Sequence, residues 1–132
     1  MNIVALDIGL KRIGVAFATN KTPPVVCTPI LRKNRNQAAS EVQAIIIEKR
    51  ADILVVGLPK GGASEDEMRR RIEHFVGLLD FGGRVEYQDE YGSSAEAVIY
   101  SGTKKDGRLD SVAAMIILER WLDANRNQLN IA

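Results

Sequence analysis

A short apolar run near the start of the chain ends on an acidic residue, and this pattern constrains the fold more than any other. Residues 3–6 are continuously apolar, as expected for a strand covered on both faces, and Asp7 follows directly. Gly9 permits a tight reversal, and residues 13–18 are predicted to form a second strand that runs back. The pattern predicts a hairpin with one carboxylate at the end of its central strand. Burying such a charge is costly unless it is paired or binds a metal ion.

The rest of the chain alternates predicted strands and helices. Further strands are predicted over 25–28 (limited by Pro29), 53–58 and 84–88, and a basic, polar linker is predicted over 32–36. Helices are predicted over about 38–50, from 64 onward, over about 93–100 and over about 109–122. The segments 64–67 and 93–96 both carry a capping-box pattern. Residues 125–132 are expected to form a polar C-terminal tail.

This order predicts an α/β fold. An antiparallel meander of three strands followed by α/β crossovers gives a mixed five-stranded sheet with helices on both faces. At 132 residues, with 45% apolar and 27% charged residues, the chain is expected to be one globular domain over 1–132.

Composition excludes several classes of function. The formal net charge of +1 does not suit a protein that coats nucleic acid by bulk charge, so any such binding must come from local basic clusters. Cys27 is the single cysteine, which excludes an internal disulfide and a zinc site built of thiolates. No stretch approaches the roughly 20 apolar residues of a membrane span. We therefore expect no membrane association and a cytoplasmic location.

Acidic residues recur at the ends of predicted elements. Asp7 and the pair Asp89-Glu90 follow strands, and Asp110 lies in the first turn of the last helix. If the first and last of these strands are neighbours, Asp7 and Glu90 face each other across one rim of the sheet, where sites usually form. Converging carboxylates repel one another unless a cation neutralises them. One or two Mg²⁺ or Mn²⁺ ions suit oxygen ligands and could activate water for phosphodiester hydrolysis.

Each acid also has a plainer explanation. Asp110 suits the first turn of any helix because of the helix dipole, and Asp89 and Glu90 are common types of turn residue. The residues alone do not decide whether Asp89 or Glu90 is the ligand. His74 lies on a charged helix and is predicted to be a surface residue.

Four motifs in order resemble one known family. Residues 6–16 (LDIGLKRIGVA), 55–59 (VVGLP), 89–90 (DE) and 109–114 (LDSVAA) resemble the YqgF/RuvX family of the RNase H-like superfamily. The resemblance spans nearly the whole chain. It implies an RNase H-like fold and nuclease activity in maturing the 5′ end of pre-16S ribosomal RNA, with Holliday junction resolution as the alternative. It also implies Asp7, Glu90 and Asp110 as the catalytic, metal-binding acids.

The sequence departs from the family at one motif. The family's Asp-Glu-Arg-x-Thr-Thr is here DEYGSS over 89–94, so Tyr91 replaces the arginine. Tyrosine cannot pair bidentately with a phosphate, which puts that contact in doubt. Lys11 and Arg12, then Lys60, are the predicted substrate contacts, whereas the arginines at 69–71 and the lysines at 104–105 are outer contacts or serve solubility.

The sequence as a whole predicts a metal-dependent hydrolase that cuts structured RNA. A resolvase of branched DNA would use the same chemistry but would normally need two active sites and hence a dimer. The loss of the arginine at Tyr91 and the near-neutral charge also leave open a non-catalytic, RNA-binding assembly factor. The oligomeric state is not predicted.

Overall fold

The structure is a computed structural model that describes residues 1–59, 65–89 and 108–131, with side chains of the last helix described from Ser111 to Asn125. The strands are β1 (Asn2–Ile8), β2 (Arg12–Thr19), β3 (Val25–Val26), β4 (Ile30–Leu31), β5 (Ile53–Leu58) and β6 (Arg84–Asp89). The helices are α1 (Arg35–Lys49), α2 (Glu65–Gly77) and α4 (Arg108–Ile131).

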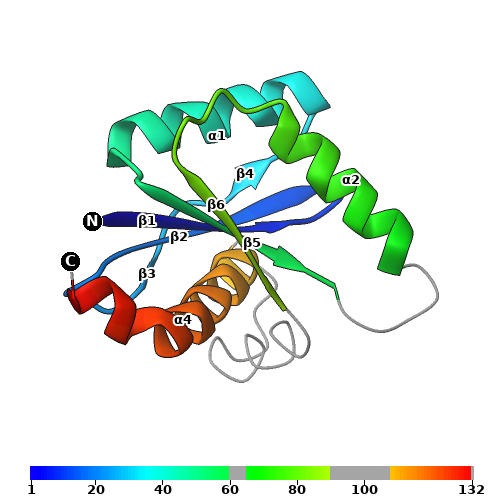
Figure 1. Cartoon of the computed structure of the whole chain (residues 1–132). Helices are drawn as coiled ribbons and strands as arrows, with labels where there is room; N and C mark the ends of the chain where they lie inside the picture. The colour runs from blue at the N-terminus through cyan, green and yellow to red at the C-terminus, as the bar shows by residue number, and fades with distance from the viewer. Residues whose placement is uncertain (60–64, 90–107, 132) are drawn as a thin grey trace.

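The described strands form one mixed sheet in the order β3-β2-β1-β5-β6, and β4 also pairs with β2. β1 pairs antiparallel with β2 and parallel with β5, and β5 pairs parallel with β6. The predicted hairpin and the mixed sheet with helices on both faces are therefore confirmed. Figure 1 shows α1 and α2 on one side of the sheet and α4 on the other.

The two faces of the sheet have separate cores because successive residues of a strand point to opposite sides. On the α1/α2 face, alternate residues of β1, β2 and β5 pack against both helices; the buried members include Val4, Leu6, Val15, Leu54, Val42, Ile46, Ile72 and Phe75. The central strand is thus covered on both sides, as its continuous apolar run predicts.

The α4 face carries small side chains where the helix crosses the hairpin. Ala5, Ala16 and Ala18 pack in one cluster with Ile117 and Trp121 of α4. Small residues on the strands let the helix backbone approach the sheet closely, so the large side chains of α4 fill the space between them. This contact fixes the course of α4 across β1 and β2.

The third strand differs from the prediction. Instead of a continuous strand over 25–28, two short strands, β3 and β4, flank Pro29 and pair with β2 at Ala16–Phe17 and Arg12–Ile13. The described sheet therefore has six strands rather than five. A side chain from α4 occupies the interval between the two short strands, as shown below.

The first helix begins three residues earlier than predicted. Asn34 caps α1, its side chain accepting a hydrogen bond of 2.7 Å from the N–H of Gln37, whose own side chain accepts from Asn34 N–H in return. Part of the predicted linker is thus helix. The helix ends at Lys49, and the capping residue Arg50 adopts the left-handed conformation with φ of 52°.

The last helix continues well past its predicted end. α4 extends to Ile131, so most of the polar segment 125–132 is helical. The predicted helix over 93–100 and the capping residue Ser64 lie outside the described residues. No described helix is long and apolar enough to cross a membrane.

Candidate active site

Asp7 lies near the carboxyl end of β1 and is half-buried. In the antiparallel register its partner on β2 is Gly14. Asp7 shares its face of the sheet with Ile3 and Ala5, which pack against α4, because residues two apart on a strand point the same way. Gly14 puts no side chain next to the carboxylate. The carboxylate is therefore directed to the α4 side of the sheet.

A tight turn follows Asp7 and requires glycine. Gly9 N–H donates a hydrogen bond of 2.9 Å to the Arg12 carbonyl oxygen, and a Cβ at position 9 would lie 2.7 Å from that oxygen. Arg32 holds the turn from outside, since its Nη1 donates to the Gly9 carbonyl oxygen at 2.7 Å and its N–H to the Lys11 carbonyl oxygen at 2.9 Å. The exposed side chains of Lys11 and Arg12 thus lie beside the end of β1 that carries Asp7.

The hydroxyl of Ser111 joins the start of α4 to this end of the sheet. Ser111 is fully buried, and its Oγ donates to the Cys27 carbonyl oxygen at 2.6 Å and accepts from Val15 N–H at 3.3 Å. Val15 follows Gly14, the register partner of Asp7. The first turn of α4, which contains Asp110, is therefore anchored beside the Asp7 end of the hairpin.

The same contact explains why the third strand is split. Cys27 N–H donates to the Val15 carbonyl oxygen at 2.8 Å, as in an antiparallel ladder. The reciprocal bond, from Val15 N–H to the Cys27 carbonyl oxygen, is replaced by the Ser111 hydroxyl placed between the two groups. Both backbone groups remain satisfied, so the interruption does not leave a buried polar group unpaired.

Asp89 lies on the other face of the sheet from Asp7. In the β5–β6 register Asp89 is opposite Leu58, and Val85 is on the same side of β6; both Leu58 and Val85 pack into the core under α1 and α2. Strand β6 is also not a neighbour of β1, because β5 lies between them. The condition under which Asp7 and Glu90 would directly face each other across neighbouring strands is thus not met.

The predicted site residues are only partly described. Glu90 and Lys60 lie outside the described residues, and for Asp110 the backbone position alone is given. Among the described side chains, no group of three His, Cys, Asp or Glu residues is placed to hold a metal ion. His74 is exposed, as predicted.

Sequence reasoning missed three residues around this end of the sheet: Ser111, Arg32 and Arg35. Ser111 belongs to the family motif over 109–114, but nothing local indicates that its hydroxyl reaches Cys27, 84 residues away. Arg32 and Arg35 fell in the predicted linker. The pattern Asn34-x-x-Gln37 is a capping box and would have placed Arg35 in the first turn of a helix.

The fold places the chain in the RNase H-like class that contains the junction resolvases. The structure is similar to that of Thermus thermophilus RuvC in complex with a Holliday junction substrate, with a TM-score of 0.64 over 95% of this chain and 96% of the other. Sequence identity is 12%, so this likeness bears on the fold alone.

The chain belongs to the RuvX family. The sequence model of that family, described as a Holliday junction resolvase, matches residues 1–124. A protein of Campylobacter lari named "Putative pre-16S rRNA nuclease" is 53% identical over 122 residues, which cover 90% of this chain and 95% of that protein. One of the same name from Sulfurimonas denitrificans is 49% identical over 126 residues, with 92% and 97% covered.

Proposed function

We propose that the protein is a divalent-metal-dependent endonuclease that hydrolyses a phosphodiester bond at the 5′ end of pre-16S ribosomal RNA. The observation that carries the proposal is the position of Asp7, at the end of a central strand beside the anchored first turn of α4. The names of the relatives at about half identity support ribosomal RNA as the substrate. A cytoplasmic location, where ribosomes are assembled, is part of the same proposal.

Asp7, Glu90 and Asp110 would hold one or two Mg²⁺ or Mn²⁺ ions. The donor set fits hard divalent cations, which prefer carboxylate oxygens. Such ions would activate water and stabilise the charge on the leaving oxygen. The opposite orientation of Asp89 supports Glu90 over Asp89 as the second acid, because Asp89 shares its face with residues packed under α1 and α2.

The chain's own basic residues would orient the strand to be cut. Lys11 and Arg12 are exposed beside the end of β1 and are the first contacts for the phosphates, with Lys60 as a further contact. Tyr91 stands where the family resemblance expects arginine, and a tyrosine cannot make the bidentate phosphate contact of a guanidinium.

A junction resolvase is the second candidate. The description of the family model, a Holliday junction resolvase, favours it. Paired cuts across a four-way junction need two active sites, so this function requires a dimer, and mass measurement in solution would test for one. A non-catalytic RNA-binding factor is the outcome if binding occurs without cutting.

The test is cleavage of two substrates by matched proteins. A structured pre-16S RNA fragment and a four-way DNA junction would be incubated with Mg²⁺, Mn²⁺ or chelator. Asp7→Asn keeps the shape of the side chain but removes its charge, and Asp123→Asn is the matched control, because Asp123 is exposed in the distal half of α4.

Metal-dependent cutting by wild type and Asp123→Asn, with no cutting by Asp7→Asn, is the expected result. Preference for the RNA supports processing, and preference for the junction supports the resolvase. Equal residual cutting in all three proteins would point to a contaminant and would overturn the proposal, as would RNA binding with no cutting under any metal condition.

A further inference from the structure

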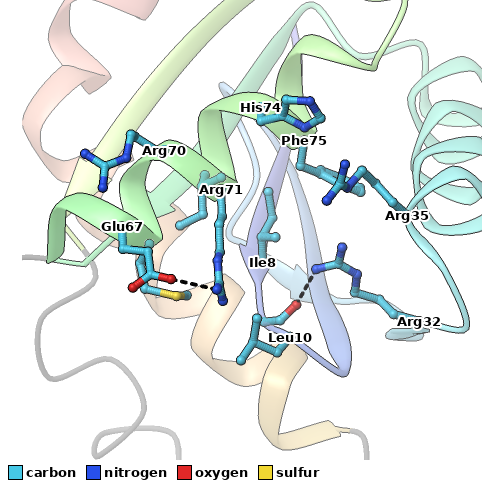
Figure 2. Close-up of a pocket in the computed structure, with 12 residues that line it drawn as sticks. Ile8, Leu10, Arg32, Arg35, Glu67, Arg70, Arg71, His74 and Phe75 are labelled. Atoms are coloured by element: carbon cyan, nitrogen blue, oxygen red, sulfur yellow. Dashed lines mark hydrogen bonds and ion pairs between the residues drawn. The ribbon is translucent and has the colours of Figure 1, made fainter. Parts of the chain in front are cut away.

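A cavity of about 460 Å³ lies on the face of the sheet away from Asp7. It is bounded by the turn after β1, the segment entering α1, and α2 (Figure 2). Arg32 and Arg35 reach in from the α1 side, and Arg71 extends from α2 toward the turn at Leu10 (Figure 2). This arginine pocket lies on the other face of the sheet from the Asp7 carboxylate.

The arginine pocket has an excess of positive charge. Four arginines line it, and Glu67 is the one carboxylate among its lining residues, already paired with Arg71 at 2.7 Å. Across the described part of the chain, no carboxylate forms an ion pair with Arg32, Arg35 or Arg70. An anion in the pocket would therefore meet cationic groups with which no described carboxylate pairs.

Two of these arginines occupy unfavourable positions. Arg35 is in the first turn of α1, which contains no acidic residue, and a cation there opposes the helix dipole. The guanidinium of Arg32 lies 5.2 Å from the centre of the Phe75 ring, an attractive cation–π contact, whereas its partial burial and the neighbouring Arg35 oppose its charge. Burial, and then the charge of Arg35, lower the pKa of Arg32. A bound anion would relieve both the repulsion between the arginines and the conflict with the dipole.

Apart from the four arginines, Glu67 and His74, the lining of the pocket is largely apolar. Ile8, Leu10, Met68, Ile72 and Phe75 line it beside the arginines. A small inorganic anion would leave this surface in water, whereas a ligand with an anionic group joined to a less polar body would cover it. A nucleotide, with its phosphate, sugar and base, has this combination.

The pocket is also linked to the candidate active site. Arg32 donates its hydrogen bond to the carbonyl oxygen of Gly9, two residues after Asp7. The turn thus has the carboxylate of Asp7 on one side of the sheet and the arginine pocket on the other. A nucleic acid strand bound at Asp7 would have to continue around this turn to reach the pocket.

We propose that the arginine pocket is a second phosphate site that binds a nucleotide outside the bond to be cut. The inference rests on the proposed nuclease function, which supplies a strand that continues beyond Asp7. The nucleotide could belong to that bound strand or be a free mononucleotide, and the chemistry of recognition is the same. Arg35 and Arg71 are the residues to vary, because Arg32 also supports the turn.

The test is binding in the presence of chelator, where no cleavage occurs. The double variant R35Q/R71Q removes two positive charges from the pocket and leaves the carboxylate of Glu67 without its ion pair to Arg71. The matched control, K21Q/R84Q, also removes two charges and frees one carboxylate, since Arg84 pairs with Glu86 at 2.6 Å. The probes are a single-stranded RNA octamer, titrated at several salt concentrations, and AMP, followed through the arginine Nε–H resonances of wild type.

R35Q/R71Q should bind the octamer at least about tenfold more weakly than wild type, and the control within about twofold. The slope of log affinity against log salt should fall by about 1.4, or about 0.7 for each lost contact to a single strand. AMP shifting the Arg35 and Arg71 resonances would support a free nucleotide as well, and octamer binding without an AMP effect would support the strand alone.

Two results would overturn the proposal that the arginine pocket binds a nucleotide. One is octamer binding that R35Q/R71Q leaves as tight as in wild type, and the other is a wild type that binds neither probe. Because cleavage is not measured, failure here is separate from failure of the nuclease.

Discussion

The Ser111 hydroxyl lies between the Val15 N–H and the Cys27 carbonyl oxygen and replaces the backbone hydrogen bond that would join them in an antiparallel pair of strands. Its Oγ is 2.6 Å from the carbonyl oxygen and 3.3 Å from the nitrogen. The contact joins residues 84 and 96 positions apart and fixes the first turn of α4 beside Asp7. A small polar side chain thus interrupts the ladder of the third strand and holds the first turn of the last helix against the hairpin.

Replacing Ser111 with alanine should destabilise the protein and misplace the first turn of α4. The variant leaves the partly buried carbonyl oxygen of Cys27 and the buried N–H of Val15 without their partner, which costs about 1–3 kcal/mol in free energy of unfolding. Urea unfolding followed by circular dichroism would measure the loss. The exposed Ser40→Ala is the control and should change stability by less than about 0.5 kcal/mol. Equal stability of the two variants would contradict the structural role.

Replacing Gly9 with alanine should distort the turn after Asp7. The new Cβ would lie 2.7 Å from the backbone oxygen of Arg12, which cannot move without opening the turn. We expect a loss of about 1–3 kcal/mol in stability. Gly77→Ala is the control, because nothing lies within 4 Å of a Cβ there. If thermal unfolding shows Gly9→Ala to be as stable as Gly77→Ala, the turn is not as tight as described.

The orientation of β6 predicts different effects on cleavage for substitutions at Asp89 and at Glu90. Glu90→Gln should lower metal-dependent cleavage by about 100-fold or more, since a lost metal ligand removes several kcal/mol of transition-state stabilisation. Asp89→Asn should change the rate by less than about tenfold, because Asp89 is on the face away from Asp7. Single-turnover rates at saturating Mg²⁺ would compare them. A larger effect from Asp89→Asn would reverse the assignment.

The thiol of Cys27 should react slowly in the folded protein. Burial raises the pKa of Cys27 above its ordinary value, and Lys49 offsets this only in part. Alkylation by iodoacetamide at pH 8 should therefore be slower than in the urea-unfolded chain. The unfolded thiol ionises near pH 8.5, below the folded value, so stability should decline as the pH rises through that range. Cys27→Ala should lack this decline, and equal alkylation rates in the folded and unfolded protein would refute the shift.

Most of the elements were predictable because their signals are local. The apolar runs that became β1 and β5 need only their own residues to be identified as buried strands. The capping box at Asn34 was equally local but was overlooked, and α1 begins accordingly earlier than predicted. The extension of α4 to Ile131 escaped prediction because the hydrophobic pattern ends near Leu122 while the helix continues.

The candidate site was predictable only as a set of residue types. That Asp7 ends a buried strand follows from its position after four apolar residues. The face on which Asp89 lies depends on which strands are neighbours and in what register, and β5 separates β6 from β1. The arginine pocket likewise joins residues from the β1–β2 turn, the start of α1 and α2, which no local pattern connects.

The amino-acid sequence by itself determined the α/β class, the hairpin with its terminal carboxylate, and the resemblance that the family match confirms. These depend on periodicity, turn chemistry and motif order, which are properties of neighbouring residues. Tertiary structure alone decided that Ser111 bridges Val15 and Cys27 and that arginines from separate segments face one cavity. Such contacts depend on the packing of distant segments, because a side chain acquires its partners only when the chain has closed around it.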